Sequence, residues 1–410
     1  MDLDTNDVIF DPFTRKLYAS IPSTAHQVTG NRIVSIDPLT GKLGTPVFIG
    51  SEPTRMGISH DGLYLYVVLS GANAVRRLDL TDLTAGTQFT TVSPLFGPFT
   101  ASDVAVMPGN NSAISTCGYA DGIQVWDVTD SGATSRPLTS GNDVYEGSVL
   151  AWGSAVNLYS NDEGLSPSTL HRFIVGDTSF AESDATYLDA VGGKITYSGG
   201  RIFSDGGGVV DPSPAPPNTP QLLGRLVGGG SSTVDTTING AFFLDQNSGQ
   251  TYHVLTAADP THFVTTGSVQ LDNLTGDAFD LIRWGGNGIA FRMAKDFSGN
   301  GSGRVISLDG YFVLPPSSVP NPAPAASFLS PNSAVAPGRN TWVTITGLNF
   351  VPGSVALWNG SQRTTVFVNS RKLQMAIPAA DLVQPAVNKV RVSNPIPGGG
   401  RSAVLTFTVQ

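Results

Sequence analysis

The chain has 410 residues, which is more than one ordinary domain needs and enough for two. Only 13% of the residues are charged, and 47 Gly and 28 Pro residues interrupt the chain, a composition that favours short strands joined by turns over long helices. The net charge of −9, without a Lys/Arg cluster or an 18-residue apolar run, argues against a nucleic-acid binder, attachment to anionic lipid and a transmembrane helix.

A pattern of short strands recurs along residues 1–314. Each copy has a short apolar strand, a turn, a second apolar strand, a polar loop and a third strand that often ends in Asp. Equivalent positions of the second strand lie about 40 to 48 residues apart, at Tyr18, Tyr66, Ile114, Leu158, Ile202, Phe242 and Ile289. Repeats of this length are typical of propeller blades, so the sequence predicts an all-β fold that begins with a seven-bladed β-propeller.

The way in which the ring closes is left open by the sequence. Fourth strands are predicted at residues 43–49 in the first blade and 311–314 in the last, so both end blades can supply four strands of their own. Closure then needs no strand exchanged between the two ends of the propeller. Alternatively, residues 1–5 add some pairing to the last blade.

Two segments near the N-terminus carry a family resemblance. Residues 33–41 (IVSIDPLTG) and 59–67 (SHDGLYLYV) resemble the YVTN-type propeller repeat of bacterial surface proteins. Residues 281–292 (LIRWGGNGIAFR) are similar to a closing blade of secreted bacterial propellers. The resemblance implies an extracellular or cell-surface location, although no signal peptide is visible after Met1. It does not imply an activity, because propellers carry many functions.

A Pro-rich linker is predicted at residues 315–324, and a second domain at residues 325–410. There the apolar side chains alternate with polar ones, as in Val343 and Ile345, which predicts an Ig-like β-sandwich. The segments LSPNS (329–333), TITGLNF (344–350), VALWNG (355–360) and IPA (377–379) resemble the IPT/TIG family. That resemblance implies a spacer or adhesive module on a secreted or surface protein.

We find no catalytic motif, metal site or cofactor site in the sequence. The five histidines have no short metal-ligand spacing, and the single Cys117 is expected to be a buried apolar side chain. The residues 296–301 are expected to be a Gly-rich loop rather than a calcium site. A ligand is expected at the central mouth of the ring, on loops between blades. The candidate binding residues there are Glu52, Arg55, Asp103, Tyr119, Glu146 and Arg283.

These observations favour a non-enzymatic extracellular binding or scaffold protein. The propeller would present a platform to a protein or glycan partner, and the Ig-like domain would act as a spacer. One alternative is a hydrolase of the lactonase type, which would need a His, an Arg and a carboxylate together at the central mouth. Another alternative is a structural subunit that self-assembles into an extracellular array.

Overall fold

The computed structural model describes residues 1–93, 97–118, 122–140, 149–162, 168–214, 218–246, 249–314, 320–396 and 398–410. The described residues form an all-β structure with three short 3-10 turns. None of the described helical turns is long and apolar enough to span a membrane.

The first three sheets of the N-terminal part follow one another along the chain. The first consists of β1 (Asp7–Asp11), β2 (Lys16–Ile21), β3 (Arg32–Ile36) and β4 (Val47–Phe48). The second consists of β5 (Pro53–Ile58), β6 (Tyr64–Leu69), β7 (Ala74–Asp79) and β8 (Thr84–Thr90), with the turn η1 (Ser70–Ala72) after β6. A ribbon of β9 (Val92–Ser93) and β10 (Gly97–Pro98) precedes the third sheet, which consists of β11 (Asp103–Val106), β12 (Ala113–Gly118), β13 (Gly122–Thr129) and β14 (Gly132–Arg136).

Four more sheets complete this part of the described chain. The fourth consists of β15 (Val149–Trp152), β16 (Asn157–Asn161), β17 (Thr169–Val175) and β18 (Phe180–Tyr187). The fifth consists of β19 (Ile195–Ser198), β20 (Arg201–Ser204), β21 (Gly208–Asp211) and β22 (Gln221–Arg225). The sixth consists of β23 (Gly230–Asp235), β24 (Gly240–Asp245), β25 (Tyr252–Asp259) and β26 (Val264–Asp272), with the turn η2 (Thr236–Ile238) after β23. The last consists of β27 (Asp277–Trp284), β28 (Gly288–Ala294) and β29 (Arg304–Asp309).

The first strands of these sheets form a closed ring, because each contacts the first strand of the next sheet and β27 contacts β1. An apolar cluster fills the space between each pair of neighbouring sheets, and one of these clusters joins the last sheet to the first. A single small sheet has two apolar faces and cannot bury both by itself, so the sheets stabilise one another around the ring.

The N-terminal segment completes the last sheet. The backbone N–H of Leu3 donates to the carbonyl of Gly303 at 3.0 Å, and Val305 donates to Met1 at 3.0 Å. Residues 311–314, predicted as the fourth strand of the last blade, are a turn in the structure. The prediction of that strand was therefore wrong, and the N-terminus provides the pairing instead. The predicted strand at residues 43–49 is shorter, since β4 covers only Val47–Phe48.

The C-terminal part is a sandwich of two sheets around one apolar core. One sheet has the order β30 (Ala325–Ser330), β32 (Thr341–Leu348), β36 (Lys372–Ile377) and β35 (Thr365–Asn369). The other has the order β31 (Ser333–Ala334), β39 (Leu405–Val409), β37 (Ala386–Asn394), β33 (Val355–Trp358) and β34 (Ser361–Arg363), and β38 (Gly400–Arg401) pairs with β37. The turn η3 (Ala379–Leu382) follows β36. Val343 and Ile345 are fully buried, as their alternation predicts.

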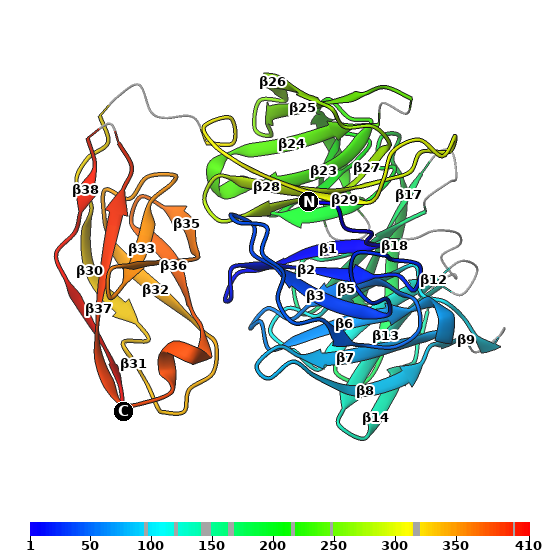
Figure 1. Cartoon of the computed structure of the whole chain (residues 1–410), viewed down its shortest axis with the longest axis horizontal. Coiled ribbons are helices and arrows are strands. Elements are labelled where there is room, and N and C mark those ends of the chain that lie inside the picture. Colours follow the sequence, from blue (N-terminus) through cyan, green and yellow to red (C-terminus); the bar gives the residue numbers. More distant parts are fainter. Residues whose placement is uncertain are drawn as a thin grey trace.

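The sandwich packs against one end of the ring (Figure 1). The Trp342 ring lies 5.4 Å from the ring of Phe13 and 6.0 Å from that of His60, between centroids. Trp342 Nε1 donates to the carbonyl of His60, and Asn340 Nδ2 donates to that of Gly62, each at 3.2 Å. These propeller residues belong to turns between first and second strands, and β35 contacts η2 in a turn of the same kind. The Ig-like domain therefore contacts the end of the ring that these turns form.

Candidate functional site

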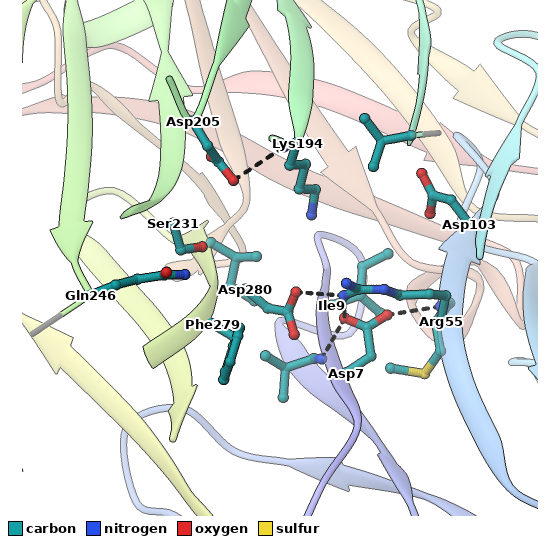
Figure 2. Close-up of a pocket in the computed structure, with 14 residues that line it drawn as sticks. Asp7, Ile9, Arg55, Asp103, Lys194, Asp205, Ser231, Gln246, Phe279 and Asp280 are labelled. Atoms are coloured by element: carbon teal, nitrogen blue, oxygen red, sulfur yellow. Dashed lines mark hydrogen bonds and ion pairs between the residues drawn. The ribbon is translucent and has the colours of Figure 1, made fainter. Parts of the chain in front are cut away.

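A cavity of about 260 Å³ lies within the ring of first strands. Every first strand contributes a lining residue, except that β19 is represented by Lys194 immediately before it. The polar lining residues are Asp7, Arg55, Asp103, Lys194, Asp205, Ser231, Gln246 and Asp280 (Figure 2). The apolar ones are Val8, Ile9, Met56, Val149, Phe279 and Ile282.

The cavity lies toward the end of the ring opposite the Ig-like domain. Asp7 and Asp103 are the first residues of β1 and β11, whereas Asp205 and Gln246 lie in turns between second and third strands. In an antiparallel sheet these two places are at the same end. That end is opposite the turns between first and second strands, which contact the Ig-like domain.

Three of the carboxylates join neighbouring sheets. Asp7 Oδ2 accepts from the backbone N–H of Met56 at 2.8 Å, and Asp103 Oδ2 accepts from that of Leu150 at 3.0 Å. Asp205 Oδ1 accepts from both the N–H and the hydroxyl of Ser232. Each bond reaches from one sheet to the first strand of the next. These bonds connect neighbouring sheets, so the three carboxylates help to fix the spacing of the sheets around the ring.

Arg55 and Asp280 enter the cavity from irregular positions. The pairing of β5 with β6 shifts between Pro53 and Met56, and that of β27 with β28 shifts between Phe279 and Ile282. Such bulges re-aim side chains, and Asp280 has a φ of +52°. Arg55 Nη1 lies 2.7 Å from Asp280 Oδ1. Arg292 holds the other oxygen of Asp280, so that this buried carboxylate has two cationic partners.

The carboxylates of the cavity differ in how well their charge is balanced. Burial raises the pKa of Asp7 to about 7, and the adjacent Asp280 adds to the shift. Burial also raises the pKa of Asp205 to about 6 and raises that of Asp103. Burial opposes ionisation of Asp280 too, yet the charges of Arg55 and Arg292 hold its pKa below the ordinary value. Of these carboxylates only Asp280, which two guanidinium groups contact, has its ionised form stabilised against the effect of burial.

Several hydrogen-bond donors of the cavity have no partner among the described residues. The Lys194 ammonium lies between Asp103 and Asp205 in Figure 2, but only its backbone N–H is bonded to a carboxylate, that of Asp205. The Gln246 amide also has no bonded partner within the described part of the chain. The Ser231 hydroxyl oxygen accepts from Leu281 N–H at 2.9 Å, and its own proton has no acceptor among the described groups.

The structure brings together two of the six candidate residues, Arg55 and Asp103. Glu52 lies in the turn before β5, where its carboxylate accepts from Ser23 N–H at 3.2 Å, and it does not line the cavity. Arg283 is near the opposite end of its strand, where it pairs with Asp235. The structure does not bring these two residues to the cavity, and their role in ligand binding stays a prediction.

The other two candidates, Tyr119 and Glu146, lie outside the described residues. The cavity residues that sequence analysis missed are Asp7, Lys194, Asp205, Ser231, Gln246 and Asp280. A signal for Asp7 was present, because Asp7-Val8 and Asp103-Val104 begin the first strands of two repeats with the same dipeptide. No comparable signal marks Asp280, since a bulge cannot be read from alternation.

No described histidine lines the cavity. His171 is buried in the fourth sheet, where Glu182 at 2.6 Å and Asp162 at 3.2 Å bind its two ring nitrogens. Burial opposes its protonation, but these carboxylates raise the pKa of His171 to about 9. Within the described residues, no group of three His, Cys, Asp or Glu side chains is arranged to hold a metal ion. Cys117 is fully buried, as predicted.

Comparisons with known proteins agree with this architecture. Residues 324–409 match the family model described as the IPT/TIG domain, and no curated protein matches the chain in sequence. The β-propeller domain of Cps50 (Swd1) from Myceliophteria thermophila is similar in structure, with a TM-score of 0.58 and 11% identity over 76% of this chain and 98% of that one. Hydrazine synthase of Kuenenia stuttgartiensis has a TM-score of 0.51 and 11% identity, over 75% and 96%.

A periplasmic gluconolactonase of Pseudomonas aeruginosa, PpgL, has 17% identity over 68% of this chain and 88% of that one, with a TM-score of 0.49. Similarity at this level supports no conclusion about activity, and the two better matches bear on the fold alone. The N-terminal part of the chain has the fold of a β-propeller, and residues 324–409 are an IPT/TIG domain of the Ig-like fold.

Proposed function

We propose that the chain is an extracellular or cell-surface binding protein of bacteria, built on a seven-bladed propeller of the YVTN type. Each of the sheets around the ring is then one blade. A propeller followed by an IPT/TIG domain fits a binding or scaffold role. In this proposal the IPT/TIG domain serves as a spacer, and the opposite end of the ring receives the partner.

The observation that carries the proposal is that the two ends of the ring differ in what they contact. One end is in contact with the Ig-like domain through Trp342 and Asn340, while the central cavity lies toward the other. Three of the carboxylates there accept hydrogen bonds that join neighbouring sheets, as for Asp7 and Asp103. This arrangement suits a rigid recognition surface more than a catalytic site whose side chains act as general acid and general base.

The test blocks each end of the ring separately. S51C places a thiol beside β5 at the cavity end, and N110C places one in the turn between β11 and β12 at the Ig-like end. Both residues are exposed, whereas the native Cys117 is fully buried and will not react. A polyethylene glycol maleimide can therefore be attached at either end. Binding of the intact chain to polysaccharide and protein fractions of a bacterial cell envelope is then measured.

We expect modification at position 51 to abolish binding to the envelope fraction and modification at position 110 to leave it unchanged. Equal loss from both modifications, or no binding by the unmodified chain, would contradict the proposal. The lactonase alternative is tested in parallel with γ- and δ-lactones. Hydrolysis by the intact chain above the buffer rate, lost when position 51 is modified, would replace the binding role with an enzymatic one.

A further inference from the structure

The chemistry of the central cavity narrows the kind of ligand that fits there. Its unpaired groups are donors: the Lys194 ammonium, the Gln246 amide and the Ser231 hydroxyl have no acceptor for their hydrogens among the described residues. Ser231 is 7% exposed, so water reaches its hydroxyl poorly. Lys194 and Gln246 are exposed at the cavity, so water satisfies their donors in the free chain, and a ligand with oxygen acceptors would take the place of that water.

The charge of the cavity disfavours an anion as that ligand. Four carboxylates and the two cations Arg55 and Lys194 line the cavity, and burial raises the pKa of Asp7 to about 7, so that this group is only partly ionised near neutral pH. Arg55 is already held by Asp280 at 2.7 Å, and Arg292 lies on the other oxygen of the same carboxylate. An anionic ligand would therefore find Lys194 as the one lining cation without a bonded carboxylate among the described residues, and it would lie beside the Asp103 and Asp205 carboxylates.

A purely cationic ligand is also a poor fit. It would compete with the Lys194 ammonium, which already lies between the carboxylates, and it would offer no acceptor to the donors of Gln246 and Ser231. A neutral ligand with hydroxyl groups provides acceptors for the donors of the cavity and adds no charge. Its oxygens accept from Lys194, Gln246 and Ser231, and its hydroxyl protons reach the second lone pairs of Asp103 and Asp205.

The size and the apolar wall agree with such a ligand. The volume of about 260 Å³ is just below the roughly 300 Å³ at which pockets for drug-sized ligands begin. Phe279, Ile282 and Val149 provide an apolar surface beside the polar groups. A sugar ring has both kinds of surface, because its C–H face is apolar and its rim carries hydroxyl groups.

We propose that the central cavity binds one neutral sugar ring, with Lys194 and Gln246 donating to its oxygens and Asp103 and Asp205 accepting from its hydroxyls. This inference rests on the proposed binding role and specifies the ligand class of the same end of the ring. A single ring is bound, either free or as the terminal unit of a longer glycan.

The test is a titration of the full chain by calorimetry with D-glucose, D-galactose and N-acetyl-D-glucosamine, next to D-glucuronate and putrescine as the charged comparators. At least one neutral sugar is expected to bind in saturable fashion, and the comparators more weakly. K194M and Q246L are each expected to weaken sugar binding about tenfold, since each removes a hydrogen bond. K295M removes an exposed lysine that does not line the cavity and is expected to change nothing.

The direction in which K194M changes binding distinguishes a cationic ligand from a neutral sugar. If K194M tightens binding of putrescine and no neutral sugar binds, the cavity is a cation site and the inference is wrong. Sugar binding that survives both K194M and Q246L would place the sugar elsewhere and would equally overturn it. If envelope binding is blocked at position 51 but no sugar binds, only this inference fails. If a neutral sugar binds through Lys194 and the envelope fractions do not bind, the proposed partner surface fails and this inference stands.

Discussion

Some charged side chains of the ring are buried. Asp280 is 6% exposed and lies between Arg55 and Arg292. Taking a carboxylate out of water is expensive, and the two guanidinium groups offset that cost only because both are within bonding distance. The bulges that carry Arg55 and Asp280 bring them together, so a backbone irregularity decides the electrostatics of the cavity.

We predict that D280N lowers the free energy of unfolding by about 3 kcal/mol, because it removes the buried carboxylate that both the Arg55 and the Arg292 guanidinium groups contact. Asparagine keeps the size of the side chain and tolerates the left-handed backbone at this position. The measurement is urea unfolding followed by circular dichroism. As the control, D189N removes an exposed carboxylate paired with Arg225 and is expected to have little effect. A similar loss in both variants would contradict the assigned role of Asp280.

Strands and turns show how the propeller closes. The last sheet has three strands of its own. Residues 1–3 pair with residues 303–305 at the start of β29 and so extend this sheet by one short segment. Leu3 is fully buried in the apolar cluster that joins the last sheet to the first, with Trp284 and Val8. The two ends of the propeller are thereby held by backbone pairing and by a shared core. This explains why residues 311–314 are free to turn away toward the second domain.

We predict that L3A lowers the free energy of unfolding by about 2 to 5 kcal/mol, because it leaves a cavity at the junction of the ring. The matched control is L39A, which truncates a leucine that is 67% exposed and is expected to change stability little. Denaturant midpoints of the two variants provide the comparison. If L3A unfolds at the same denaturant concentration as L39A, the N-terminal segment does not contribute to ring closure.

At the scale of the whole molecule, the two domains lie in contact. Trp342 packs between Phe13 and His60, and Arg15 Nη1 donates to the carbonyl of Gln362 at 3.2 Å. These contacts place the IPT/TIG domain against one end of the ring, which leaves the cavity end for a partner. An IPT/TIG domain that is docked in this way holds a set orientation relative to the propeller.

We predict that W342A releases the IPT/TIG domain from the propeller without unfolding either domain, because it removes the aromatic contacts and a hydrogen bond together. Small-angle X-ray scattering should show a larger radius of gyration, while circular dichroism stays unchanged. F328A removes a 56% exposed aromatic side chain of β30 in the same domain and serves as the control. Unchanged scattering from W342A would show that other contacts hold the domains together.

The sequence by itself determined the all-β class, the propeller fold and the position of the IPT/TIG domain. It could do so because repeats, alternation and turn residues are local signals. It also predicted Arg55 and Asp103 at the cavity, since both stand in first strands that the repeat locates. The shared Asp-Val start of β1 and β11 would have added Asp7.

Only the tertiary structure decided the rest. Lys194, Asp205 and Asp280 belong to three different sheets, and they meet because the ring closes. The fourth pairing partner of the last sheet is the opposite end of the propeller, which no local pattern encodes. Which end of the ring remains open depends on where the second domain packs. These features arise from contacts between residues far apart in the chain, so they follow from closure and docking rather than from any one segment.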